Sequence, residues 1–124
     1  MTHGRFVYLA EHICARDLRY SKKILKRQPK NPARFQREFS AVINSYEQTL
    51  RNLRGLTPPT SDAKSFRHML ARFNLQDLLG NNLLQASELG EVHTFKSTLR
   101  KLDRNDKVLK ARALALDLPT CAKE

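Results

Sequence analysis

The chain is poor in the residues on which recognisable functional motifs depend. Its 124 residues include four glycines, two cysteines and no tryptophan. The sequence lacks a glycine-rich phosphate loop, a nucleophile elbow, a dinucleotide-binding fingerprint and any Cys-x-x-Cys metal motif. No apolar run approaches the roughly 18 residues that a membrane-spanning helix needs. We therefore expect a non-enzymatic protein with no cofactor, no metal site and no transmembrane segment.

Residues 1–5 also lack the apolar core of a signal sequence. The chain as written is therefore either intracellular or what remains after removal of a targeting segment. The length suits a single domain, residues 1–124. The sequence contains no strand pattern, low-complexity tract or interdomain linker, so we expect this domain to be helical throughout.

Acidic residues are scarce. There are 12 of them against 23 lysines and arginines, which gives a net charge of +11. Residues 16–37 contain nine basic residues and one acidic residue, Asp17, so this stretch alone carries +8. A concentrated field of one sign attracts anionic partners. The candidate anion-binding residues are Arg16, Arg19, Lys22, Lys23, Lys26, Arg27, Lys30, Arg34 and Arg37.

The sign of this charge does not identify the partner, because nucleic acid, acidic lipid head groups and anionic wall polymers all carry negative charge. The simplest interpretation is a solvated face that keeps the protein soluble. However, like charges three and four residues apart destabilise a helix slightly. An anion that neutralises the run accounts for it more readily, and we treat this stretch as the candidate functional face.

Apolar residues recur at helical spacing in four segments, about 5–27, 32–54, 62–88 and 91–116. The predicted inward positions of the first two segments are Phe6, Val7, Ala10, Ile13, Cys14, Leu18, Ile24, Leu25, Phe35, Phe39, Val42, Tyr46, Leu50 and Leu53. Those of the last two are Phe66, Met69, Leu70, Phe73, Leu78, Leu79, Leu83, Leu84, Ala86, Val92, Phe95, Leu99, Leu102, Val108, Leu109 and Ala113. Similar lengths and short connections predict an all-α, antiparallel up-down-up-down four-helix bundle.

Proline and glycine mark the ends of these helices. Pro29 ends the first, while Asn31 is a good N-cap for the second and Pro32 suits its first position. Gly55 and Gly90 are placed to end the second and third helices in the left-handed conformation. The candidate N-caps of the third helix are Thr60, Ser61 and Asp62.

Two cysteines lie near opposite ends of the chain. Cys14 is on the apolar side of the first helix, and Cys121 is in the tail after the fourth. In the predicted bundle the tail returns to the end where the first helix starts, so it can fold back toward Cys14. A bond there would constrain a loop of over 100 residues, which the chain-entropy model values at about 4–5 kcal/mol. The geometry permits this bond, and a buried free thiol or a reactive thiol are the alternatives.

Several segments resemble a known family. They are RQPKNP at 27–32, LRGLTPP at 53–59, LGE at 89–91 and ALALDLPTCA at 113–122. Together they are similar to the small exported helical-bundle proteins and lipoproteins of actinobacteria, most of them without assigned function. The resemblance covers nearly the entire chain and implies a structural disulfide through Cys14 and Cys121. It supplies no catalytic residue, and Asp117 stands where the family pattern has glycine.

Other candidate chemistry is weak. His12 lies two residues from Cys14, so the two side chains point about 200° apart on a helix and form no local catalytic pair. No two histidines have the i,i+4 spacing of a helical metal site. Asp103 and Asp106 are helical neighbours, but the surrounding lysines and arginines favour ordinary surface ion pairs. A small apolar ligand between helices near Gly80 is a further alternative, for which the sequence offers no polar selector.

We therefore expect a non-enzymatic, disulfide-closed bundle at the cell envelope, in an extracytoplasmic location, since disulfides persist in oxidising compartments. Its expected partner is an anionic envelope component or an acidic protein. The alternative is a cytoplasmic helical module with reduced cysteines that binds nucleic acid or another protein.

Overall fold

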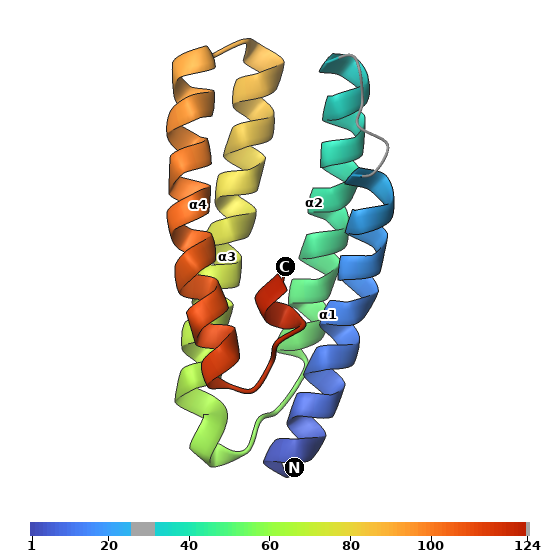
Figure 1. Ribbon diagram of the computed structural model, residues 1–124, viewed down its shortest axis with the longest axis vertical. Helices are drawn as coiled ribbons and strands as arrows, with labels where there is room; N and C mark the ends of the chain where they lie inside the picture. Colours follow the sequence, from blue (N-terminus) through green and yellow to red (C-terminus); the bar gives the residue numbers. More distant parts are fainter. Residues whose placement is uncertain (26–31, 124) are drawn as a thin grey trace.

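The structure is a computed structural model that describes the backbone of residues 1–25 and 32–123 and the side chains of residues 1–19 and 36–123. Within these ranges it is all-helical and has no strand (Figure 1). The elements are α1 (His3–Leu25), α2 (Pro32–Arg54), α3 (Thr60–Leu89), α4 (Val92–Ala115) and a final 3₁₀ turn, η1 (Cys121–Lys123). The helices alternate in direction along the bundle, so the predicted four-helix, up-down arrangement is confirmed.

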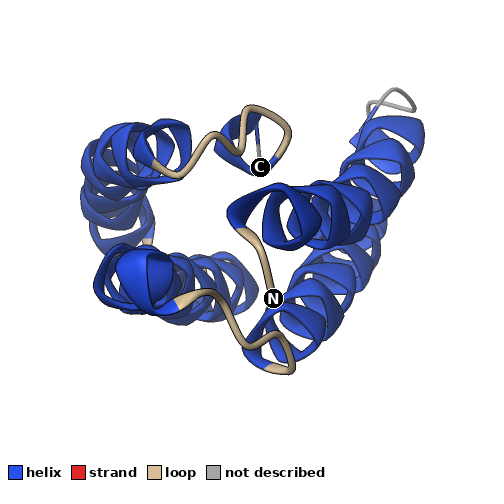
Figure 2. Cartoon of the chain, turned by 90° about the horizontal axis from the view of Figure 1, so that it is seen from below, coloured by secondary structure: helices blue, strands red, loops and turns tan. Residues whose placement is uncertain are grey.

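The bundle is not closed in the ordinary way. The α1–α2 pair and the α3–α4 pair stand side by side, and α2 packs against α3 (Figure 2). Between α1 and α4 lies the C-terminal segment, whose η1 turn contacts both helices. Leu116 and Leu118 of this segment are fully buried, although the sequence predicted Leu116 as the end of the fourth helix and Leu118 in a short tail. The tail therefore acts as a fifth packing element over the half of the bundle that holds the termini.

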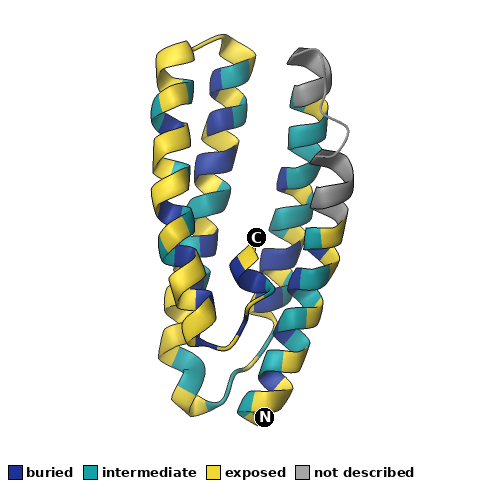
Figure 3. Cartoon of the chain, viewed as in Figure 1, coloured by how far each residue is buried: buried dark blue, intermediate teal, exposed yellow. Residues whose placement is uncertain are grey.

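Most predicted inward residues do face the core (Figure 3). Three of them do not: Leu78, Val92 and Leu99 are 56%, 64% and 41% exposed. Val92 begins α4 at the end far from the tail, where no described element covers it. Conversely, Ile43 is buried although it is absent from the predicted stripe. The predicted core residues whose side chains lie outside the described ranges are Ile24, Leu25 and Phe35.

The predicted helix ends are partly right. α2 begins at Pro32, and Gly90 ends α3 in the left-handed conformation with φ 69°. Gly55 directly follows the last residue of α2, as predicted, but the prediction that it takes the left-handed conformation is wrong. Its N–H still bonds to the carbonyl of Arg51 at 3.3 Å, and its φ is not positive. The chain leaves α2 toward Pro58 without the reversal that needs a left-handed residue.

The start of α3 also differs from the prediction. Its N-cap is Pro59, and no side chain caps the helix, so the predicted caps Thr60, Ser61 and Asp62 are wrong. Asp62 lies inside the helix, and its carboxylate pairs with His3 of α1. The predicted stop at Pro29 and cap at Asn31 lie outside the described residues.

Gly80 lies in the middle of α3 and is buried against Ile43 of α2. A Cβ built at this position would lie 3.8 Å from the Ile43 Cγ1 atom, which is ordinary van der Waals contact. Gly80 therefore permits close approach of the two helices without demanding glycine.

We expect Gly80→Ala to raise the free energy of unfolding by about 0.5–1 kcal/mol, because alanine has the higher helix propensity. Urea unfolding followed by circular dichroism measures this change. Gly4→Ala, at a helical glycine with open space around it, is the control for propensity alone. A loss of stability in Gly80→Ala would mean that the two helices pack more closely than described.

Candidate functional site

A buried disulfide ties the tail to α1. Cys14 and Cys121 are bonded, with their Cα atoms 5.1 Å apart, and neither residue is exposed to solvent. The predicted pairing is confirmed, and the alternatives of a free or reactive thiol are wrong because the sulfur of Cys14 is already bonded. The bond also contradicts the alternative in which both cysteines are reduced.

A carboxylate next to the disulfide fixes the backbone of the tail. Glu11 of α1 accepts hydrogen bonds from the backbone N–H of Thr120 at 3.0 Å and from that of Cys121 at 3.2 Å. Thr120 directly precedes η1 and Cys121 is its first residue. The carboxylate therefore both holds the turn and sets its orientation. Sequence reasoning missed this role, since a lone glutamate on a helix carries no signal for a partner more than 100 residues away.

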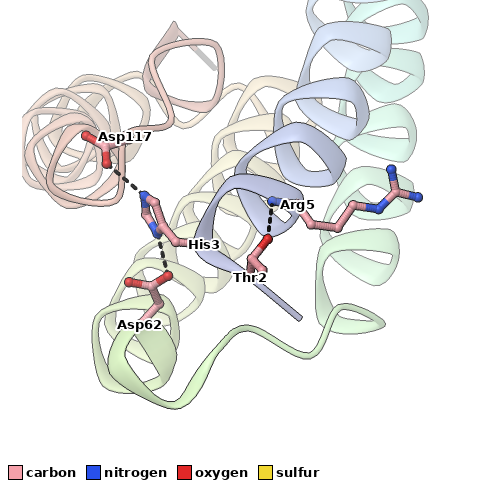
Figure 4. Close-up of polar contacts among 5 residues, drawn as sticks. All are labelled: Thr2, His3, Arg5, Asp62 and Asp117. Carbon is pink, nitrogen blue, oxygen red and sulfur yellow. Dashed lines mark hydrogen bonds and ion pairs between the residues drawn. The ribbon is translucent and has the colours of Figure 1, made fainter.

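A second polar contact closes the same end of the bundle (Figure 4). The His3 ring lies between two carboxylates, with Nδ1 2.6 Å from Asp62 and Nε2 2.8 Å from Asp117. The hydrogen bond to Asp62 is the main cause of a raised His3 pKa, and the bond to Asp117 adds to it. The protonated ring donates from both nitrogens, so it joins α1 to the start of α3 and to the tail.

Asp117 makes the turn that leads from α4 into the tail. It is the one described non-glycine residue in the left-handed conformation, with φ 63°. Aspartate tolerates this conformation better than most residues. The turn that glycine would make is thus made by Asp117, whose side chain then reaches His3.

In the described part of the predicted basic face, the positive charges are exposed and no described acidic residue pairs with them. Arg16 and Arg19 on α1 and Arg37 on α2 are exposed, and within the described residues they form no hydrogen bond or ion pair. Asp17 is only 3% exposed and accepts a short hydrogen bond from Ser45 of α2. The side chains of the other predicted members lie outside the described residues: Lys22, Lys23, Lys26, Arg27, Lys30 and Arg34.

Arg16 and Arg19 also border a hollow between α1 and α2, which we call the α1–α2 groove. It encloses about 420 Å³, with Leu9, Ile13 and Leu56 among its apolar lining. Its polar lining includes His12, Gln48 and Asn52. The Gln48 amide already donates to Asn52 at 3.1 Å, and the Asp17 carboxylate also lines the groove. The guanidinium groups of Arg16 and Arg19 at its border are therefore the donors that suit phosphate or carboxylate oxygens. The sequence did not reveal this contribution of α2, because Gln48 and Asn52 lie outside the basic stretch.

A second hollow of about 400 Å³ lies among α2, α3 and α4. We call it the acidic cleft. Gly80 is part of its lining, together with the apolar residues Phe39, Val42, Ile43, Leu83, Leu99 and Leu102. Three carboxylates also line it: Asp77 of α3 and Asp103 and Asp106 of α4. The cleft therefore lies where the sequence allowed a small apolar ligand. Asp103 and Asp106 were recognised in the sequence as neighbours on a helix, but their position in this cleft and the contribution of Asp77 were not.

The carboxylates of the acidic cleft are not equivalent. Asp106 forms the expected surface ion pair, with Lys110 Nζ 3.0 Å away. Asp103 has no such partner among the described residues. Burial, together with the neighbouring carboxyl of Glu47, raises the pKa of Asp77 to about 6.

The remaining candidates from the sequence lie apart from one another. His68 and His93 are exposed, and His12 Nδ1 lies 3.2 Å from the carbonyl of Tyr8 one turn earlier. In the part of the chain that the structure covers, no group of three histidine, cysteine or acidic side chains is placed to hold a metal ion. Among the described helices, none is long and apolar enough to span a membrane.

Comparisons with protein-family models, with curated proteins and with solved structures find no match for this chain.

Replacing both cysteines, as Cys14→Ala with Cys121→Ala, is expected to lower the free energy of unfolding by about 4 kcal/mol, because the unfolded chain loses a cross-link over roughly 100 residues. Urea unfolding measures the loss. Wild-type protein in reductant should lose a similar amount, whereas Glu11→Gln, which keeps the disulfide, should lose less. Equal midpoints for the double variant and oxidised wild type would contradict a structural role for the bond.

His3 should make stability depend on pH. Because its pKa is raised in the folded protein, its contribution is present below the ordinary histidine pKa of about 6.5 and is lost as pH rises through the raised value. We expect His3→Gln to lower Tm near pH 6 and to have little effect near pH 9. His93→Gln, at an exposed histidine, is the control. A Tm difference that stays the same at both pH values would contradict the ionic contact.

Proposed function

We propose that the protein is an exported, non-enzymatic helical bundle of the cell envelope that docks on an anionic lipid surface through its basic face. The observation that carries this proposal is the state of the charges on α1. Arg16 and Arg19 are exposed and have no partner among the residues that the structure describes, while Asp17, the one acidic residue of the basic stretch, is turned into the α1–α2 contact.

The disulfide supports the extracytoplasmic part of this proposal. A fully buried Cys14–Cys121 bond is typical of proteins that fold in oxidising compartments. We likewise propose membership of the exported actinobacterial bundles, which rests on the segments quoted above and on the disulfide that they imply.

The mechanism is neutralisation of many charges by weak individual contacts. Each lysine or arginine near an acidic lipid surface contributes about 1 kcal/mol, and this attraction decays within a Debye length. Arg16 and Arg19 lie at the border of the α1–α2 groove, so a head-group phosphate that the surface charge has attracted can accept hydrogen bonds from their guanidinium groups. Binding should therefore weaken as the ionic strength rises.

Co-sedimentation with vesicles tests the proposal. We expect recovery with vesicles that contain an acidic phospholipid at low ionic strength, and little recovery with purely zwitterionic vesicles. The double variant Arg16→Gln with Arg19→Gln should lower the partition coefficient about 30-fold, which corresponds to two contacts of about 1 kcal/mol.

The control is Lys96→Gln with Arg100→Gln, which removes the same charge from exposed positions on α4. It should lower binding much less than the α1 variant. Equal recovery with acidic and zwitterionic vesicles would overturn the lipid proposal. An equal loss in both variants would show that net charge, and not the α1 face, governs association.

A further inference from the structure

The acidic cleft lies beyond the part of the bundle that the tail occupies. The C-terminal segment fills the space between α1 and α4 only over the half of the bundle that holds the termini (Figure 1). The cleft is formed further along by Ile43 of α2, Leu83 of α3 and Leu102 of α4. Its volume of about 400 Å³ falls in the range of small-molecule pockets, about 300–1,000 Å³.

The charge of this cleft is opposite to that of the protein. Lysines and arginines outnumber acidic residues by 23 to 12 in the chain, yet the described lining of the cleft contains three aspartates and no basic residue. Asp106 is already neutralised by its ion pair with Lys110. Asp103 and Asp77, which lie on different helices, are left as the carboxylates that can receive a positive charge.

The environment of Asp77 favours an added cation. The Glu47 carboxyl of α2 lies beside it, and Asn81 donates to both side chains, at 3.4 Å to Asp77 Oδ1 and 3.3 Å to Glu47 Oε1. The positive charge of Arg54 of α2 lowers the pKa of Asp77, but by less than Glu47 raises it. Two neighbouring carboxylates at the edge of an apolar hollow repel each other, and a bound cation relieves this repulsion.

We propose that the acidic cleft binds an amphiphilic organic cation, with an apolar body against the floor of the cleft and an ammonium group between Asp77 and Asp103. The apolar floor gives affinity for the body, and the two carboxylates select the charge. An anion is repelled at this position, and a neutral apolar molecule leaves the carboxylates uncompensated.

Affinity should rise with pH. Asp77 faces Glu47 and Arg54 from α2 and Asn81 on its own helix, and Asp103 and Asp106 line the cleft from α4. Because the pKa of Asp77 is raised to about 6, this carboxyl is largely neutral near pH 5 and charged near pH 7.5. The cation should therefore bind more tightly at the higher pH.

The test is a titration of ¹⁵N-labelled protein followed by amide chemical shifts, with phenylbutyltrimethylammonium as the probe. The matched anion is phenylbutanesulfonate. The cation should shift the amides of Ile43, Gly80 and Leu83, and it should bind more tightly at about pH 7.5 than at about pH 5. The anion should leave these amides unchanged, whatever it does at the basic face.

Two variants make the test specific. Asp103→Asn should lower the affinity for the cation about two- to fivefold, which is the scale of one partly exposed ion pair. Glu91→Gln removes the same charge outside the cleft lining and should leave the affinity unchanged. Asp77→Asn should remove the pH dependence. Equal shifts of the cleft amides with cation and anion, or no effect of Asp103→Asn, would overturn the proposal.

Discussion

The rest of the structure depends on the attachment of the C-terminal segment to α1. In a four-helix bundle, the first and last helices normally pack against each other. Among the described residues α1 and α4 have no extensive contact, and they are bridged by η1 and the two buried leucines before it, Leu116 and Leu118. Such a short segment cannot bury enough apolar surface to hold itself in place. The attachment of the segment is completed by three further interactions: the Cys14–Cys121 bond, the hydrogen bonds to the Glu11 carboxylate and the contact between His3 and Asp117.

The two halves of the bundle differ in what fills their interior. At the end that holds the termini, the tail fills the interior and the packing is dense around Phe6 and Phe73. Further along, the tail is absent and the acidic cleft remains. The α1–α2 groove lies on another part of the molecule and has the opposite charge character. We therefore propose that one small domain presents an arginine-bordered surface for anions and a separate carboxylate-lined cleft for cations.

Local sequence signals predicted the helices well, because an apolar stripe and its ending residues act within a few turns. Pro32 and Gly90 are examples, and so is Cys14, whose position on the apolar side left only an inward direction for its sulfur. The predictions failed where tertiary contacts decide. Gly55 stays out of the left-handed region because the chain continues without reversing, and Asp62 is drawn into a contact with His3.

The candidate sites show the same distinction. The basic stretch is visible in the sequence because its charges lie close together along the chain, within residues 16–37. The acidic cleft is not, since Asp77 and Asp103 are 26 positions apart and each is surrounded locally by ordinary helical neighbours. Only the packing of α3 on α4 brings them to the same hollow. Likewise, nothing local to Asp17 indicates that it faces Ser45 and leaves the neighbouring arginines uncompensated.

The most direct test of this account is peptide mapping by mass spectrometry of natively produced protein, with free thiols alkylated before digestion under non-reducing conditions. We expect a linked pair of peptides that contain Cys14 and Cys121. Two fully alkylated cysteines would contradict it, because the tail would then lack the bond that holds it between α1 and α4, and the argument for an oxidising compartment would be lost.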